Sequence, residues 1–154
     1  WYIDRIKDRA SDNPQVRLLG GLYDQELLDQ LYANARTYIH GHSVGGTNPS
    51  LLRAMGAGAP VLAFDCEFNR EVTAEGAFYW DDADALAAIL DEVADGDVDA
   101  ELAEFSQRGR ERIAEHYRWD TVTDQYEALL HLLADRKVTG TRRRAANDPS
   151  GHVA

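Results

Sequence analysis

The sequence has little sulfur and no long apolar run. Its single cysteine, Cys66, cannot form an internal disulfide, and one thiol without partners does not make a metal site. No stretch approaches the roughly 18 apolar residues of a membrane-spanning helix, and the N-terminus lacks the basic and then apolar pattern of a signal peptide. These absences predict a cytoplasmic protein in a reducing compartment, with no transmembrane segment.

Basic residues are scarce as well. There are 16 of them against 27 acidic residues, which gives a net charge of −11, and only Lys7 and Lys137 are lysines. The summed field repels nucleic acid, so we expect no nucleic-acid partner. A surface rich in aspartate and poor in lysine suits solubility at high salt, which hints at a halophilic source.

The chain is long enough for one domain. It has 154 residues, of which 44% are hydrophobic, so it can bury one sizeable core. It opens on Trp1, and its only methionine is Met55. We therefore expect it to be the C-terminal part of a longer protein.

Short apolar runs alternate with amphipathic segments, a pattern typical of βαβ units. It predicts an α/β fold, a partial Rossmann-like parallel sheet flanked by helices. Strands are expected at residues 16–19, 37–40, 60–64 and 77–80. Helices are expected at residues 2–10, 24–34, 49–57, 83–94, 99–116 and 120–135, with a short helical turn at residues 70–74. The domain should span residues 1–138, and residues 139–154, rich in Gly, Pro, Asn and Arg, should form a disordered tail.

A Gly-rich loop precedes the helix that is expected to start at Pro49. Residues 43–50 read Ser-Val-Gly-Gly-Thr-Asn-Pro-Ser and lie between a strand and a helix, where ligands bind in open α/β sheets. Glycines let a ligand approach the backbone, and the first N–H groups of a helix favour phosphate. The loop lacks the lysine of a P-loop and the three glycines of a dinucleotide fingerprint, so on the residues alone a plain turn of small residues stays equally open.

A second polar loop, residues 65–71, follows the next strand and should reach the same edge of the sheet. Arg70 can pair with a phosphate or a carboxylate, and Glu71 can accept hydrogen bonds from sugar hydroxyls. The alternative is that both belong to a solvated helix face. His40 and His42 flank Gly41, and the sequence offers them no further metal ligand, so no metal site is expected.

Three segments, residues 38–52, 54–61 and 68–72, resemble the C-terminal domain of the family 4 glycosyltransferases, the group 1 retaining GT-B enzymes. The likeness is closest to the rhamnosyltransferase-like branch. It extends loosely to residues 117–120, which are similar to the family's entry into its last helix. The resemblance implies a hexose or deoxyhexose transferase, with rhamnose as one candidate sugar, that uses a nucleotide-sugar donor and a polysaccharide or lipid-linked acceptor. It also implies a missing N-terminal GT-B domain and no need for a metal or other cofactor.

The resemblance also implies which residues bind. The catalytic candidates are Arg70 and Glu71. The candidates for nucleotide binding are His42, Gly45, Gly46, Thr47, Asn48, Ser50, Arg53 and Asn69.

The chain departs from the family pattern at one position that matters. The family signature has two glutamates, and in this chain their positions are occupied by Gly45 and Arg53. Arginine only donates hydrogen bonds, so Arg53 cannot accept them from ribose hydroxyls as a glutamate does. A non-catalytic binding or scaffold fragment that needs a partner chain is therefore the alternative to a transferase. An epimerase-type GT-B relative is a weaker one, because its acid and base residues are not recognisable.

Overall fold

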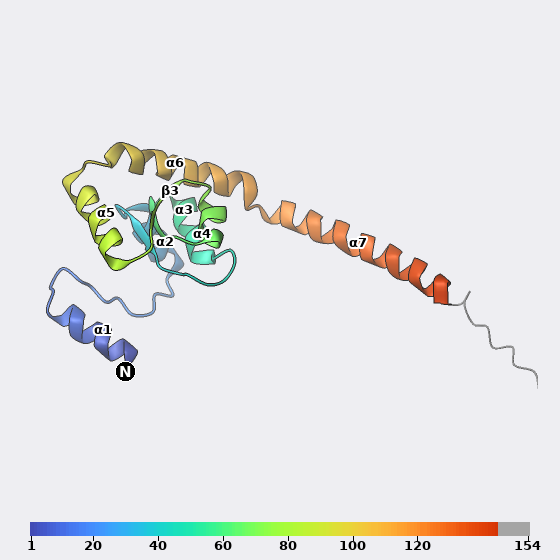
Figure 1. The fold of residues 1–154 in the computed structure, drawn as a ribbon, viewed down its shortest axis with the longest axis horizontal. Helices are drawn as coiled ribbons and strands as arrows, with labels where there is room; N and C mark the ends of the chain where they lie inside the picture. Colours follow the sequence, from blue (N-terminus) through green and yellow to red (C-terminus); the bar gives the residue numbers. More distant parts are fainter. Residues whose placement is uncertain (145–154) are drawn as a thin grey trace, which may run out of the picture.

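The computed structural model describes residues 1–144, and it forms an α/β body from which a long helix projects (Figure 1). In chain order the elements are α1 (Tyr2–Ser11), α2 (Gln25–Ala33), β1 (Tyr38–His40), α3 (Pro49–Ala57), β2 (Val61–Phe64), α4 (Glu67–Thr73), β3 (Ala77–Trp80), α5 (Ala83–Asp95), α6 (Asp99–His116) and α7 (Trp119–Arg144). Among the helices of residues 1–144, none combines the length and the apolar character of a membrane-spanning segment.

The sheet has three parallel strands in the order β1-β2-β3, which confirms the predicted parallel α/β fold. Tyr38 pairs with Val61, and Val61 pairs in turn with Ala77. All three strands therefore end at the same edge, where the loops after β1 and β2 lie.

Two helical layers cover the sheet. On one face, buried side chains of α3 and α4 pack on β2 and β3; this core consists of Leu51, Met55, Val61, Ala63, Val72 and Ala77. On the other face, Phe78 packs against a smaller cluster from α5 and the start of α6, made by Val93, Val98 and Leu102. Adjacent residues of β3 thus point to opposite layers, as the two-residue period of a strand requires.

Helix α3 is fixed at both ends. Asn48 caps its start, and its side-chain oxygen accepts a hydrogen bond from the Ser50 N–H at 2.9 Å. Gly58 ends it with φ +88°, a left-handed conformation that favours glycine at the end of a helix. The Ser106 hydroxyl donates to the Gly58 carbonyl at 2.7 Å and ties this end to α6.

The strand expected at residues 16–19 does not form, and this prediction was wrong. Residues 16–24 carry no helix or strand, and Val16, Leu18 and Leu19 are about half exposed. A strand needs a neighbour to bond with, and no described strand pairs with this segment.

Two other boundaries differ from expectation. Helix α4 starts at Glu67, not at Arg70, so most of the expected second loop is helical. Helix α7 continues to Arg144, past the expected helix end at residue 135. The domain boundary at residue 138 stays a prediction. The prediction of the helix end followed the apolar period, which stops at Leu133, whereas the backbone hydrogen bonds of a helix can continue without an apolar face. Residues 145–154 of the expected tail lie outside the described residues.

Candidate functional site

The Gly-rich loop lies between β1 and α3, at the edge where the strands end. Gly45 has φ +121°, a conformation that side chains of other residues disfavour. A Cβ built on Gly45 or on Gly46 meets no atom within 4 Å, so the backbone there faces open space. No described residue accepts a hydrogen bond from the N–H of Gly45, Gly46 or Thr47. The loop therefore leaves donors free next to the positive end of the α3 dipole.

The space beneath the loop is small. A cavity of about 10 Å³ lies between the loop and the start of α4, lined by His42, Val44, Gly45, Gly46, Asn48, Cys66, Phe68 and Asn69. This volume is about that of a single water site. A ligand of the size of a diphosphate must therefore lie on the outer side of the loop.

Asn69 stands under this loop, with 4% of its surface exposed. Its side-chain nitrogen donates to the His42 carbonyl at 2.9 Å and to the Phe64 carbonyl at 2.8 Å. Both amide protons are thus used within the protein. Asn69 reaches the predicted site, but its donors hold the loop instead of facing a ligand.

Arg70 and Glu71 lie on α4, as the alternative interpretation of a solvated helix face expected. The Arg70 guanidinium bonds both oxygens of Asp65, at 2.6 and 2.8 Å, and stacks on the Tyr79 ring with 4.1 Å from its carbon to the ring centre. This hydrogen bonding holds the pKa of the Asp65 carboxyl below its ordinary value. Arg70 is 49% exposed, so an anionic ligand can reach it in competition with Asp65. Glu71 is exposed, and its backbone carbonyl accepts a hydrogen bond from Arg112 at 2.6 Å.

Arg53 points away from the Gly-rich loop, toward α2. Its guanidinium donates to the Asp29 carboxylate at 2.6 Å and to both the side-chain and backbone oxygens of Gln25, the latter at 3.0 Å. The hydrogen bond from Arg53 lowers the pKa of Asp29. Arg53 also lines a groove of about 540 Å³ between α2, α3 and the end of α6. This pairing could not be predicted from the sequence, because Asp29 lies 24 positions away from Arg53.

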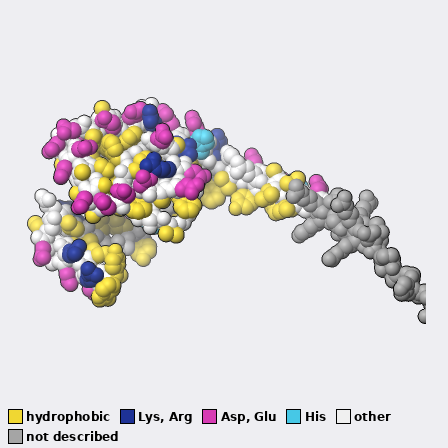
Figure 2. All heavy atoms as spheres, in the orientation of Figure 1, with side chains coloured by type: hydrophobic (Ala, Val, Ile, Leu, Met, Phe, Trp, Pro, Cys, Tyr) yellow, Lys and Arg dark blue, Asp and Glu magenta, His cyan; other side chains and the backbone are white. Residues whose placement is uncertain are grey.

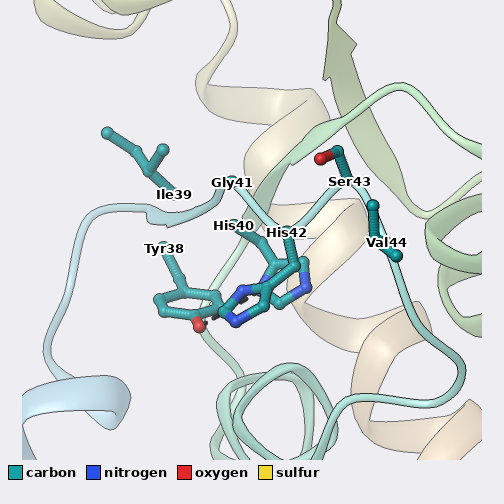
Figure 3. Close-up of a pocket in the computed structure, with 7 residues that line it drawn as sticks. All are labelled: Tyr38, Ile39, His40, Gly41, His42, Ser43 and Val44. Atoms are coloured by element: carbon teal, nitrogen blue, oxygen red, sulfur yellow. Dashed lines mark hydrogen bonds between the residues drawn. The ribbon is translucent and has the colours of Figure 1, made fainter.

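Tyr38, His40 and His42 form a row along β1 and the start of the loop, while Ile39 points the other way (Figure 3). The His40 and His42 rings stack with 4.9 Å between their centres and 19° between their planes. His40 is 1% exposed; its Nδ1 lies 3.3 Å from the Tyr38 hydroxyl, and its Nε2 has no partner among the described residues. Burial, aided by the nearby His42, lowers the pKa of His40, and burial raises that of Tyr38 to about 12.

The row lines an open hollow of about 490 Å³ at the entrance of the Gly-rich loop. Its outermost member, His42, is exposed and therefore accessible to a ligand. Within the described part of the chain, no group of three His, Cys, Asp or Glu side chains is placed to hold a metal ion.

The structure thus brings most candidate residues to one place. His42, Gly45, Gly46, Thr47, Asn48 and Ser50 lie on the loop and the first turn of α3, with Asn69 beneath them. Arg70 and Glu71 follow on α4, and Arg53 lies apart at the contact with α2. Two residues of this region were not among the predicted site residues: Tyr38, which contacts His40, and Asp65, which pairs with Arg70.

Comparison with known proteins gives the family. The family described as Glycosyl transferases group 1 matches residues 3–95, more than half of the chain, so the chain belongs to this family. The chain is also similar to O-antigen chain mannosyltransferase B of Escherichia coli, with 28% identity over 123 residues. That alignment covers 79% of this chain and 31% of the relative, so the chain spans about a third of that protein's length. The predicted group 1 membership is confirmed, and the rhamnosyltransferase-like branch stays a prediction.

Proposed function

We propose that this chain is the nucleotide-sugar-binding part of a retaining GT-B glycosyltransferase, and that residues 43–48 bind the diphosphate of the donor. The observation that carries the proposal is the open loop at the N-terminus of α3, with unused N–H groups at Gly45, Gly46 and Thr47. It occurs in a chain that belongs to the group 1 glycosyl transferases.

The physical chemistry of the reaction fits this loop. When the glycosidic bond to the nucleotide breaks, the departing diphosphate gains negative charge. Backbone donors and a helix dipole that are already in place stabilise this charge without reorganisation, and they do so without a metal ion. Retention of configuration would then follow from attack on the same face of the sugar, assisted by the leaving group.

Two side chains of α4 are proposed to act beside the loop. Arg70 would exchange Asp65 for a donor phosphate, since its bidentate geometry suits either group. Glu71, whose side chain is exposed, would accept hydrogen bonds from sugar hydroxyls. His42, at the entrance of the loop, would donate a hydrogen bond to the nucleotide-sugar.

The proposed donor carries a hexose or deoxyhexose. Mannose is supported by the name of the Escherichia coli relative, and rhamnose by the sequence resemblance. The proposed acceptor is a polysaccharide or a lipid-linked glycan. Transfer would require the second GT-B domain, because the acceptor in such enzymes lies between the two domains.

A second candidate function rests on Arg53. In this chain an arginine, held by Asp29, stands where the family pattern has a glutamate for the ribose. A fragment that has lost ribose binding would serve as a scaffold for a partner chain and would bind no nucleotide by itself.

Calorimetric titration of the full chain with UDP, dTDP and GDP separates the two candidates. We expect one of these nucleotides to bind the wild-type chain. The Gly46→Leu variant should bind it at least about tenfold more weakly, because the new side chain fills the space that the diphosphate would occupy. Gly46 has room for a Cβ in the ligand-free protein, so this variant should fold normally.

The matched control is Ala100→Leu, which also enlarges an exposed side chain to leucine but lies on α6, away from the loop. It should bind the nucleotide as the wild type does. Equal affinity of Gly46→Leu and wild type would place the nucleotide elsewhere. Absence of binding by the wild type would favour the scaffold.

A further inference from the structure

The Asn69 side chain joins three segments that are separate in the sequence. It belongs to α4, and it donates to the Phe64 carbonyl at the end of β2 and to the His42 carbonyl at the entrance of the Gly-rich loop. The two distances, 2.8 and 2.9 Å, are those of good hydrogen bonds. One amide thus ties the loop after β1 to the strand next to it.

The chemistry of this contact requires a side chain with two donors. Asn69 is 4% exposed, so its amide protons have little access to water and rely on acceptors within the protein, which are these two carbonyl groups. The Cys66 thiol also lies near the His42 carbonyl, at 3.9 Å, but a thiol is a weak donor. Both bonds come from the one side-chain nitrogen, so a carboxylate at position 69 would place an oxygen where that nitrogen faces the two carbonyl groups, and this oxygen would repel both.

The loop is held from its other end by a second amide. Asn48 caps α3 through Ser50, so residues 43–47 run between two asparagine anchors. Between the anchors, the described residues offer the loop N–H groups no partner. The loop therefore depends on its ends for its shape.

We propose that Asn69 is a positioning residue that holds residues 43–47 in the conformation that binds the donor's diphosphate, without touching the ligand. The proposal rests on the proposed function of this loop. It assigns Asn69 a role different from direct nucleotide contact, because both of its amide protons are already engaged by carbonyl groups.

The variant that tests this role is Asn69→Asp. It keeps the size of the side chain and removes both donors while the carboxyl is ionised. When the carboxyl is protonated it regains one donor, and the two facing carbonyl groups should raise its pKa into an accessible range. The effect of the substitution should therefore diminish as the pH falls.

The matched control is Thr73→Val, one turn further along α4. Thr73 is 2% exposed, and its hydroxyl bonds to the backbone carbonyl of Asn69 at 2.8 Å and to the Tyr79 hydroxyl at 2.5 Å; within residues 1–144 it makes no hydrogen bond to the Asn69 side chain or the loop. A general loss of stability in α4 would affect both variants. A loss of loop position would affect only Asn69→Asp.

Two measurements on the full chain complete the test. The first is the NMR order parameters of the Gly45 and Gly46 amides without ligand, which should fall in Asn69→Asp at pH 8 and not in Thr73→Val. The second is calorimetric titration with UDP, dTDP and GDP between pH 8 and pH 5. Asn69→Asp should bind roughly tenfold more weakly than wild type at pH 8, and the ratio of the two affinities should approach one toward pH 5.

Unchanged order parameters in Asn69→Asp, or an equal fall in Thr73→Val, would overturn the proposal. So would an affinity ratio that does not change with pH. If Asn69→Asp does not fold, Asn69→Ser, which keeps one donor and adds no charge, replaces it in the first measurement. If the wild type binds no nucleotide, the proposed function fails, and the order parameters alone decide whether Asn69 holds the loop.

Discussion

The His40 imidazole lies deep in the row of rings that leads to the Gly-rich loop. It is 1% exposed, the His42 ring stacks on one of its faces, and the Tyr38 hydroxyl meets its Nδ1. A charge on this ring would be buried against a second histidine. The folded protein therefore favours the neutral form and lowers the pKa of His40.

This burial predicts a pH dependence of stability. In the unfolded chain His40 takes up a proton near its ordinary pKa of 6.5, whereas in the folded protein it does so only at lower pH. As the pH falls below 6.5 the unfolded state binds more protons, so the free energy of unfolding should decrease, by at most about 1.4 kcal/mol per pH unit from this group. Urea unfolding between pH 8 and pH 5 measures the slope.

His40→Gln is the comparison for this prediction, because glutamine is polar and does not titrate. Its free energy of unfolding should change less over the same pH range. Parallel profiles for the two proteins would mean that His40 contributes nothing to the slope.

At the scale of elements, the end of α4 is the least favourable turn of the site. Ala74 and Glu75 have φ of 46° and 64°, in the left-handed region where a Cβ is disfavoured. Ala74 is the C-cap of the helix that carries Asn69 and Arg70. Two backbone hydrogen bonds accompany the turn: the Ala74 N–H donates to the Arg70 carbonyl and the Gly76 N–H donates to the Thr73 carbonyl, both at 2.9 Å.

Replacing Ala74 with glycine should relieve this strain. We expect Ala74→Gly to raise the free energy of unfolding by about 1 kcal/mol, as a left-handed helix cap favours glycine. The same substitution in the interior of a helix has the opposite sign, so Ala103→Gly at an exposed position of α6 should lower it by about 1 kcal/mol. Thermal or urea unfolding of the two variants checks the contrast. Two changes of the same sign would contradict the claim that the left-handed conformation of Ala74 is strained.

Elements with local signals were predictable from the sequence. Asn48, Pro49 and Gly58 mark both ends of α3 by their own chemistry, and the apolar run at residues 60–64 marks β2. Residues 16–19 have a similar apolar pattern, but a strand also requires a partner, which a sequence does not reveal. The Gly-rich loop was predictable as well, because its glycines and the helix start that follows are also local signals. The partners of Arg53 and Asn69 were not, because Asp29 and His42 are brought to them only by the fold.

At the scale of the whole molecule, α7 stands apart from the body. Figure 1 shows it projecting from the end of α6, and Figure 2 shows hydrophobic side chains along its lower side. Several of its large apolar residues are at least 45% exposed, namely Trp119, Tyr126, Leu129, Leu130, Leu132 and Leu133. A contiguous apolar surface of this kind binds hydrophobic dyes.

Removing this helix should therefore leave the body intact. We expect a chain that ends at Arg118 to unfold within about 0.5 kcal/mol of the full chain, because the two core clusters contain no residue of α7. Its fluorescence with the dye ANS should fall. Loss of cooperative unfolding in the shortened chain would show that α7 supports the body.

The Gly-rich loop also has a consequence for how such a protein evolves. Its central residues face open space, whereas its anchors, Asn48 and Asn69, are bonded to the backbone. Mutations at Ser43, Val44 and Gly46 can therefore accumulate at small cost to folding and alter what the loop accepts. Ligand preference can drift in this region while selection for a stable fold acts elsewhere, at the anchors and the sheet.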